Sequence, residues 1–178
     1  DDVITTVRDV IAQNIADGTS YAGFRDAMGD RLKTSFLGDG HAETVYRTNV
    51  QAAFRDGRET LMANPVVDEL FPYQEYIPIT DDRVRNEHAA LGKLGLNGTG
   101  VYRRDDPFWD RFTPPWGFNC RCGVNVLTKE QAARKGVREA QRWVATGEPP
   151  ARPEHRWGDI PFEPNPGFGQ RGTPTLIV

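Results

Sequence analysis

The sequence predicts an α+β fold, in which a helical N-terminal part packs on a small antiparallel sheet and an irregular, proline-rich C-terminal tail follows. In the first third of the chain, apolar residues recur three or four positions apart, as on one face of a helix. Alternating segments near residues 73 to 79 and 120 to 126 are typical of strands. Seven of the 13 prolines fall within residues 148 to 178, which we expect to be extended. Residues 1 to 147 are then expected to form a single α+β domain.

Three helices are expected within residues 3 to 62. The first should end near Gly18, and Ser20 is placed to cap the second. The third should close at Asn64, because the residue before a proline is pushed out of the helical region. The apolar positions that we expect to trace the three buried faces are Val3, Ile4, Val7, Val10, Ile11 and Ile15, then Phe24, Met28, Leu32 and Phe36, then Tyr46, Val50, Ala53, Phe54, Leu61 and Met62.

The middle of the chain combines short regular elements with a long irregular segment. Pro78 places the first strand at a sheet edge or ends it. Asp81 and Asp82 are candidates to cap a short helix that runs through Leu91 to Gly92. The following segment is rich in Gly, Pro and Asp, yet its aromatic content predicts an ordered region packed on the core. Its aromatic residues are Phe108, Trp109, Phe112 and Trp116.

A last helical region is predicted after the second strand. Thr128 and Gln131 have the spacing of a capping box, in which each residue satisfies a backbone N–H of the other. The helix that this box opens should run to Trp143, with an interruption at Gly136.

Composition narrows the classes of function. The formal net charge of −3 argues against a broad nucleic-acid-binding surface, although a local basic patch is compatible with it. No apolar run approaches the roughly 20 residues that span a bilayer, so no membrane partner is expected. Two cysteines do not make a disulfide framework, which favours a cytosolic protein. The start Asp1-Asp2-Val3 lacks the basic and apolar regions of a signal peptide, and the missing Met suggests a fragment of a longer chain.

His88 and the cysteine pair are the first candidates for chemistry. His88 shares a predicted helix face with Val84 and Leu91, and we favour a partly buried histidine over a general base. On a strand the Cα atoms of Cys120 and Cys122 would lie roughly 6.5–7 Å apart, too far for an unstrained disulfide. We therefore expect two buried structural cysteines. The alternative is a zinc site made by these cysteines with His88 and one of two carboxylates, Asp81 or Asp82.

Arginines provide the second candidate site. Arg47, Arg55 and Arg58 fall at helical spacing and would form a stripe for phosphate or an acidic partner. The interpretation that we favour is a solvated helix face, paired with nearby acidic residues. Those acidic residues are Glu43, Asp56 and Glu59, and the further arginines that we consider as contacts are Arg83, Arg85 and Arg121.

No motif of an enzyme is legible. The chain has no nucleophile elbow, P-loop or dinucleotide fingerprint, and it holds only three histidines. We therefore predict no catalytic residue, no cofactor and no resident metal.

Seven landmarks follow one another with a characteristic order and spacing. They are residues 46–54, 76–88, 91–92, 106–109, 114–117, 119–122 and 165–167. The series resembles the head-morphogenesis family named after protein F of phage Mu. The likeness runs from about residue 40 to 168, and the first forty residues contribute no landmark.

The resemblance implies a minor head protein of a phage or prophage, present in few copies in the virion and not an enzyme. Such proteins are expected in the capsid interior or near the portal, and in the host cytoplasm during assembly. The implied partners are the portal or other head proteins, and possible roles include DNA packaging or delivery with weak contact to DNA. Two alternatives stay open. One is a metal-dependent, nuclease-like enzyme using His88, nearby carboxylates and the cysteines. The other is a nucleic-acid-binding module acting through Arg47, Arg55, Arg83, Arg85 and Arg121.

Overall fold

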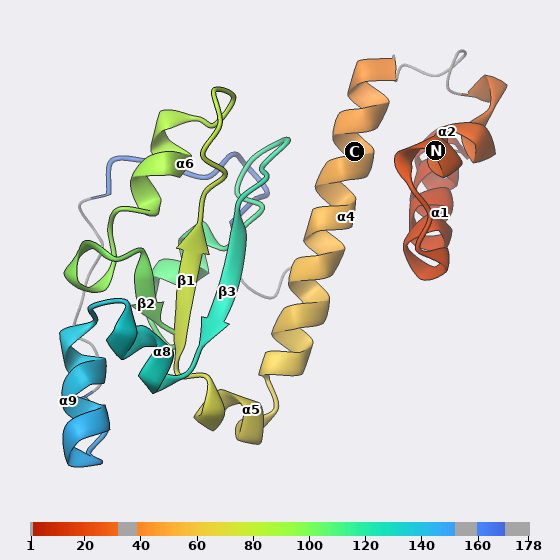
Figure 1. Cartoon of the computed structure of the whole chain (residues 1–178). Helices are drawn as coiled ribbons and strands as arrows, with labels where there is room; N and C mark the ends of the chain where they lie inside the picture. Colours follow the sequence, from red (N-terminus) through yellow and green to blue (C-terminus); the bar gives the residue numbers. More distant parts are fainter. Residues whose placement is uncertain (1, 32–38, 152–159, 170–178) are drawn as a thin grey trace.

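The computed structural model describes residues 2–31, 39–151 and 160–169 of the 178-residue chain. A helical unit lies at one end, a small sheet with its covering helices at the other, and the long helix α4 runs from the first toward the second (Figure 1). In chain order the elements are α1 (Asp2–Asp17), α2 (Tyr21–Met28), α4 (Asp39–Met62), α5 (Pro65–Leu70), β1 (Tyr73–Ile77), α6 (Asn86–Leu91), the 3-10 helix η1 (Leu96–Gly98), β2 (Val101–Arg103), α7 (Phe108–Phe112), β3 (Gly123–Leu127), α8 (Lys129–Arg134) and α9 (Arg138–Thr146).

The helical unit buries the apolar faces of α1 and α2 against the first half of α4. Its core consists of Val7, Ile11, Phe24, Met28, Ala42, Val45 and Tyr46. The helix α1 ends before Gly18, whose φ of 64° favours glycine, so this predicted boundary is confirmed. Ser20 occupies the predicted cap position, but its side chain makes no capping hydrogen bond. Leu32 and Phe36 lie outside the described residues.

The predicted buried stripe of α4 is wrong in its second half. Phe54 is 76% exposed and Leu61 is 64% exposed. The buried positions follow a different phase of the helix and include polar side chains, because this half of α4 faces the loops around the sheet and not another apolar helix. The buried residues of α4 are Ala42, Val45, Tyr46, Thr48, Asn49, Ala52, Arg55 and Met62, of which Tyr46 and Met62 belonged to the predicted stripe. Ile4 and Ile15 of α1, also expected on a buried face, are exposed.

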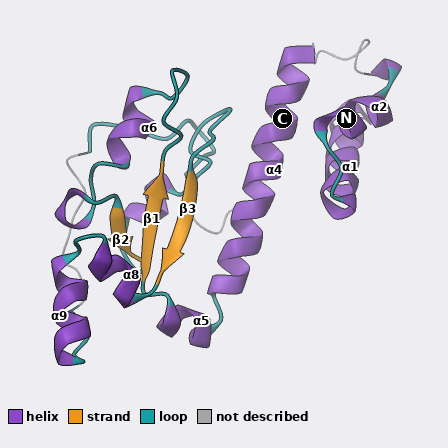
Figure 2. Ribbon diagram, in the orientation of Figure 1, coloured by secondary structure: helices purple, strands orange, loops and turns teal. Residues whose placement is uncertain are grey.

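The sheet is antiparallel with strand order β2-β1-β3 (Figure 2). Tyr73 of β1 lies opposite Arg103 of β2 on one side and Leu127 of β3 on the other. Pro78 follows directly after β1, so it ends the strand, which is central and not at an edge. The second predicted strand begins three residues later than expected. Both cysteines therefore precede β3 and do not lie on it.

Each face of the sheet covers a separate core. On one face Tyr76 and Tyr102 pack with the aromatic residues of α7 and with Trp116. The Tyr102 and Phe108 rings stack with centroids 3.7 Å apart. On the other face Tyr73, Val101 and Leu127 pack against α8 and α9. The irregular, aromatic-rich segment is therefore ordered and buried, as predicted.

Of the two helix caps predicted after the first strand, one is confirmed and one is wrong. The capping box of Thr128 and Gln131 is present and opens α8, and the helical region is interrupted around Gly136, as predicted. The expectation that Asp81 and Asp82 cap the next helix is wrong, because α6 begins later with Arg85 in the cap position. Asp81 instead accepts the backbone N–H of Arg83 and bonds Arg121, as described below.

Part of the predicted tail is described, and it contacts the sheet region. Residues 160–169 form neither helix nor strand, yet Ile160 and Phe168 are buried. The Asn165 N–H donates to the Trp116 carbonyl at 3.1 Å, and Arg111 donates to the Phe162 carbonyl at 2.8 Å. Residues 152–159 and 170–178 of the tail lie outside the described residues. Among the described helices, none combines the length and apolarity needed to cross a membrane.

Candidate functional site

A cavity of about 890 Å³ lies between α4 and the loops that precede α6 and β3. The six arginines that sequence analysis marked as candidate contacts all line it. They are Arg47, Arg55 and Arg58 from α4, with Arg83, Arg85 and Arg121 from the opposite wall. In the described lining, Glu43 is the one acidic residue facing these six cations. The lining is therefore rich in arginine, although five of the six arginines are paired with a carboxylate of Glu43, Asp56, Glu59 or Asp81.

The arginines of α4 form the predicted ion pairs, but the expectation of a solvated face is wrong at Arg55, which is buried. Arg47 Nη2 lies 2.6 Å from Glu43 Oε1, and its side chain is 59% exposed. Arg55 is buried and lies 2.7 Å from Asp56 Oδ1, whereas Arg58 lies 3.3 Å from Glu59 Oε1. Exposed pairs such as Arg47 with Glu43 contribute about 0–1 kcal/mol to stability. They therefore leave the exposed arginines able to exchange partners.

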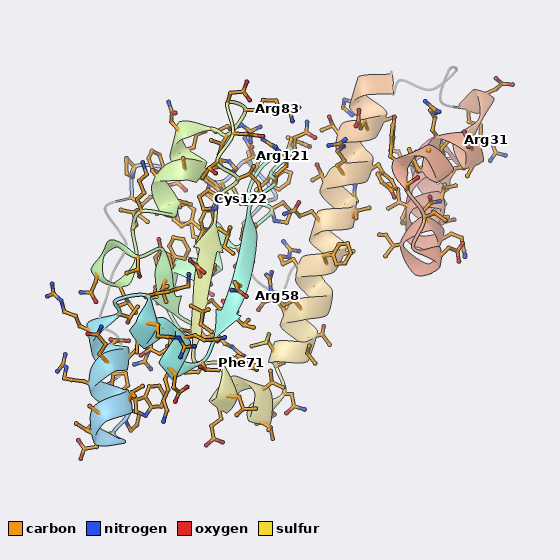
Figure 3. All side chains as sticks on the ribbon, viewed as in Figure 1. Arg31, Arg58, Phe71, Arg83, Arg121 and Cys122 are labelled. Atoms are coloured by element: carbon orange, nitrogen blue, oxygen red, sulfur yellow. The ribbon has the colours of Figure 1, made fainter. Side chains whose placement is uncertain are left out.

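On the opposite wall Arg121 holds Asp81 through two hydrogen bonds of 2.6 and 2.7 Å. This bidentate contact with Arg121 lowers the pKa of Asp81 to about 2. Arg83 lies 3.9 Å from the same carboxylate. Figure 3 shows Arg83 and Arg121 near the upper end of the sheet region, close to Cys122.

A buried cluster of His88, Cys120 and Cys122 borders the same cavity. His88 Nδ1 lies 3.3 Å from Cys122 Sγ and 3.6 Å from Cys120 Sγ. Both cysteines are free and buried. The predicted proximity of His88 to the cysteine segment and the predicted burial of the cysteines are confirmed. Asp82, named with these residues in the zinc alternative, is exposed and does not belong to the cluster.

Several groups fix the histidine ring. The ring stacks on Trp116, with centroids 4.0 Å apart and planes 21° from parallel. Arg85 Nη1 lies 3.4 Å from His88 Nε2, while Arg85 Nη2 donates to the Phe118 carbonyl at 2.9 Å. Because a guanidinium only donates, Nε2 accepts in this arrangement, and the ring hydrogen lies on Nδ1, toward the sulfur atoms.

The two thiols differ in acidity because they share hydrogen bonds. A bond from the Cys120 thiol lowers the pKa of Cys122 to about 5, against the opposing effect of burial, and bonds from His88 and Tyr76 act in the same direction. The bond to Cys122 and burial both raise the pKa of Cys120. Burial, followed by the nearby Cys122, raises the pKa of Tyr76. The neighbours of Cys122 thus favour its thiolate over that of Cys120.

Sequence analysis missed the residues that position this cluster. Tyr76 accepts the indole N–H of Trp116 at 2.8 Å, and Gln51 of α4 donates to the Cys122 carbonyl at 2.5 Å. Asn119 Nδ2 donates to Thr44 Oγ1 of α4 at 3.0 Å. Tyr76, Gln51 and Asn119 fall within the landmarks of the family resemblance, whereas Thr44 does not. Membership in a landmark was the sequence signal that could have identified these three residues.

The match to known proteins starts closer to the N-terminus than the landmarks do. A family model described as "Phage Mu protein F like protein" matches residues 5–125. The chain belongs to this family. The match includes most of α1 and all of α2, where no landmark lies, and it ends within β3.

Two curated relatives are similar over most of the chain. One is named "Putative capsid assembly protein F", of Escherichia phage Mu, and is 30% identical over 155 residues, which are 76% of this chain and 34% of the relative. The other is the "Mu-like prophage FluMu F protein" of Haemophilus influenzae, 29% identical over 153 residues, which are 77% of this chain and 35% of the relative. The chain thus spans about a third of the length of either relative. No solved structure matches it.

Proposed function

We propose that this chain acts in phage head morphogenesis as a minor head protein that binds an acidic segment of another head protein in the arginine-lined cavity. The observation that carries the proposal is the convergence of six arginines from two walls on one cavity. The name of the phage Mu relative, a putative capsid assembly protein, supports a role in assembly. A position in the capsid interior near the portal, and a part in DNA packaging or delivery, belong to the same proposal.

The shape and lining of the cavity favour a protein segment as the ligand. Its volume lies within the range of about 300–1,000 Å³ that is usual for binding pockets. Phe54, Ile79 and Val84 add apolar surface to the lining, and Phe54 is 76% exposed. Arginine beside an exposed aromatic side chain is typical of the residues that dominate protein interfaces. An acidic segment that also carries apolar side chains would match both features.

The existing ion pairs set the mode of binding. Partner carboxylates would compete with Glu43 for Arg47 and with Asp81 for Arg83, and both arginines are largely exposed. Such an exchange contributes more to partner choice and to the rate of association than to affinity. Arg121 is held by two bonds to Asp81 and would serve as a fixed point of the wall.

The arrangement around His88 supports a non-enzymatic role. A nuclease-like site would need His88 and a carboxylate to converge in an open pocket. In the described part of the chain, the group of candidate metal ligands around His88 contains two cysteines and no carboxylate. Asp81 points instead to Arg121. We also propose that residues 1–147 act as one domain, against which residues 160–169 of the tail pack.

Charge reversal in the cavity tests the docking proposal. The double variant Arg47→Glu with Arg83→Glu should weaken binding to purified portal or other head proteins about tenfold or more, because like charges across an interface cost several kcal/mol. Biolayer interferometry on the 178-residue chain measures this. The matched control is Arg8→Glu, since Arg8 is 56% exposed, ion-paired and on α1 outside the cavity lining. Equal binding by both variants would contradict the proposal.

Nucleic acid and catalysis form the second arm of the test. We expect weak DNA binding that fades as salt rises toward physiological strength. Tight, salt-resistant DNA binding would favour the nucleic-acid-binding module instead. The chain is also incubated with DNA and RNA, with and without divalent metals, beside His88→Ala. Cleavage that needs metal and disappears in His88→Ala would establish the nuclease-like enzyme.

A further inference from the structure

We propose that His88, Cys120 and Cys122 form a binding site for a zinc-class cation, with the fourth coordination position open to the cavity. The inference goes beyond docking of a head protein and does not depend on it. From the sequence alone, we favoured two structural cysteines over a zinc site at these residues. The distances between the side chains change that weighting.

The three ligand atoms have a spacing close to that of a tetrahedral site. Zinc binds thiolate sulfur at about 2.3 Å and imidazole nitrogen at about 2.0–2.1 Å, which in a tetrahedron places nitrogen and sulfur about 3.6 Å apart. The two observed distances from His88 Nδ1 to the sulfur atoms are 3.3 and 3.6 Å. All three atoms lie within 4.8 Å of one another. Small side-chain adjustments would therefore suffice for an ion to bind.

The donor set selects the class of cation. Two thiol sulfurs and one imidazole nitrogen are soft or intermediate ligands, which suit zinc, whereas magnesium and calcium prefer carboxylate, carbonyl and water oxygens. In the described residues no carboxylate joins the cluster. A hard cation is therefore not expected there.

The backbone around the cysteines brings both sulfur atoms to the same histidine. On a strand, the Cα atoms of two cysteines separated by one residue would lie roughly 6.5–7 Å apart on one face. Here both precede β3, in a loop whose Cys120 N–H donates to the Gly117 carbonyl at 3.2 Å. The Arg121 side chain between them bonds Asp81 on the cavity wall, while both sulfur atoms approach His88.

The site is also held in place from outside. Stacking on Trp116 fixes the histidine ring, and the bond from Gln51 fixes the Cys122 carbonyl. An ion would connect α6 to the start of β3 and would bind ligands that are already assembled. The three residues also line the cavity, so water from the cavity can complete a three-ligand site.

One contact must change when the ion binds. Coordination through Nδ1 leaves the ring hydrogen on Nε2, which then faces Arg85 Nη1, another donor, at 3.4 Å. Arg85 is exposed and keeps its second bond to the Phe118 carbonyl, so Nη1 can turn away. Replacing Arg85 with alanine should therefore preserve zinc binding or strengthen it.

Metal content and cobalt spectra of the full 178-residue chain, prepared reduced and without a histidine tag, test the proposal. We expect about one zinc ion per chain by elemental analysis, and competition with a chromophoric chelator for that ion. Cobalt should give a thiolate-to-metal absorption band of a tetrahedral site. A wild-type chain that binds no zinc and shows no such band would overturn the proposal, and this outcome does not depend on any variant folding.

Variants then identify the ligands. Cys120→Ser, Cys122→Ser and His88→Gln should each lose the cobalt band, with folding checked by circular dichroism. His41→Gln, an exposed histidine on α4, and Asp82→Ala are the matched controls and should keep it. The cavity variant Arg47→Glu with Arg83→Glu should also keep it, so failure of docking and failure of the metal site are distinguishable. Loss of the band in Asp82→Ala, or its survival in Cys122→Ser, would contradict the assigned ligand set.

Discussion

In the helical unit, side chains from α1, α2 and α4 interlock mainly through apolar contact, whereas around the sheet the large buried side chains are also tied by hydrogen bonds. Phe24 and Tyr46 illustrate the first, with ring centroids 5.1 Å apart in the helical core. Trp109 and Trp116 illustrate the second, because their indole N–H groups donate to the Arg103 carbonyl and to the Tyr76 hydroxyl.

This difference matches the roles that we assign to the two regions: the helical unit is a scaffold, and the sheet region carries the candidate site. Apolar contact is non-directional and tolerates shifts of a helix, whereas hydrogen bonds fix orientation. In the sheet region, such hydrogen bonds fix the side chains around the cluster of His88, Cys120 and Cys122 that borders the cavity. The helical unit adds no residue from α1 or α2 to the described lining of that cavity. Substitutions should therefore affect the two regions differently.

The largest effect is expected from Trp109→Ala in the sheet region. Trp109 is 1% exposed, so its removal should lower the free energy of unfolding by roughly 3–5 kcal/mol. Chemical denaturation followed by circular dichroism measures the change, with Trp143→Ala, at the partly buried Trp143, as the milder control. An unchanged denaturation midpoint would show that the aromatic cluster is peripheral.

Ile11→Ala makes the corresponding change in the helical unit. Ile11 is 2% exposed, and its truncation should cost about 2–5 kcal/mol. We expect hydrogen exchange to quicken in α1, α2 and the first half of α4 while the strands stay protected. Ile15→Ala, at an exposed position of the same helix, should have little effect. Equal loss of protection in the strands would show that the two regions unfold together.

Removing one tyrosine hydroxyl from each region compares the contribution of their side-chain hydrogen bonds. Tyr76→Phe leaves the buried Trp116 N–H unpaired and should cost about 1–3 kcal/mol. Tyr46→Phe removes a part-buried bond to the Thr19 carbonyl and should cost only about 0.5–1.5 kcal/mol. Denaturation midpoints of the two variants give the comparison. A larger cost at Tyr46 would reverse the distinction between the regions.

The smallest effect that we expect is on the dependence of stability on pH, through Asp81 in the cavity wall. The bond to Arg121 lowers the pKa of Asp81 from its ordinary 3.8 to about 2. The carboxylate therefore binds fewer protons in the folded than in the unfolded chain, and its stabilisation is full above about pH 4 and lost as the pH falls through about 2. Asp81→Asn should remove this part of the dependence of stability on pH. Arg121→Met should remove the same part, and a pH profile unchanged in both variants would contradict the assignment.

Sequence patterns predicted the elements whose signals are local. The helices that contain Val7 and Val45, the capping box at Thr128 and the strand from Tyr73 follow from spacing and capping rules. The strand at Val101–Arg103 was missed because three residues are too few to show alternation. The buried phase of α4 was also missed, since a face that meets polar loops need not be apolar.

The sequence predicted which residues belong to the site better than it predicted how they are arranged in space. Residue type selected the six arginines, His88 and both cysteines, and all of them border one cavity. Their convergence depends on contacts between distant parts of the chain, such as Gln51 with Cys122. The zinc alternative named one of Asp81 or Asp82 as a fourth ligand, yet neither belongs to the cluster.

The length of α4 has a mechanical consequence. Its 24 residues extend about 36 Å at 1.5 Å per residue, and its first turns both pack in the core of the helical unit and line the cavity. For a rod of that length, a tilt of about 5° moves the far end by about 3 Å. Because one unbroken helix serves both regions, a tilt of α4 relative to the sheet would also move the arginines that it carries. It would widen or narrow the space between the arginines of the two walls.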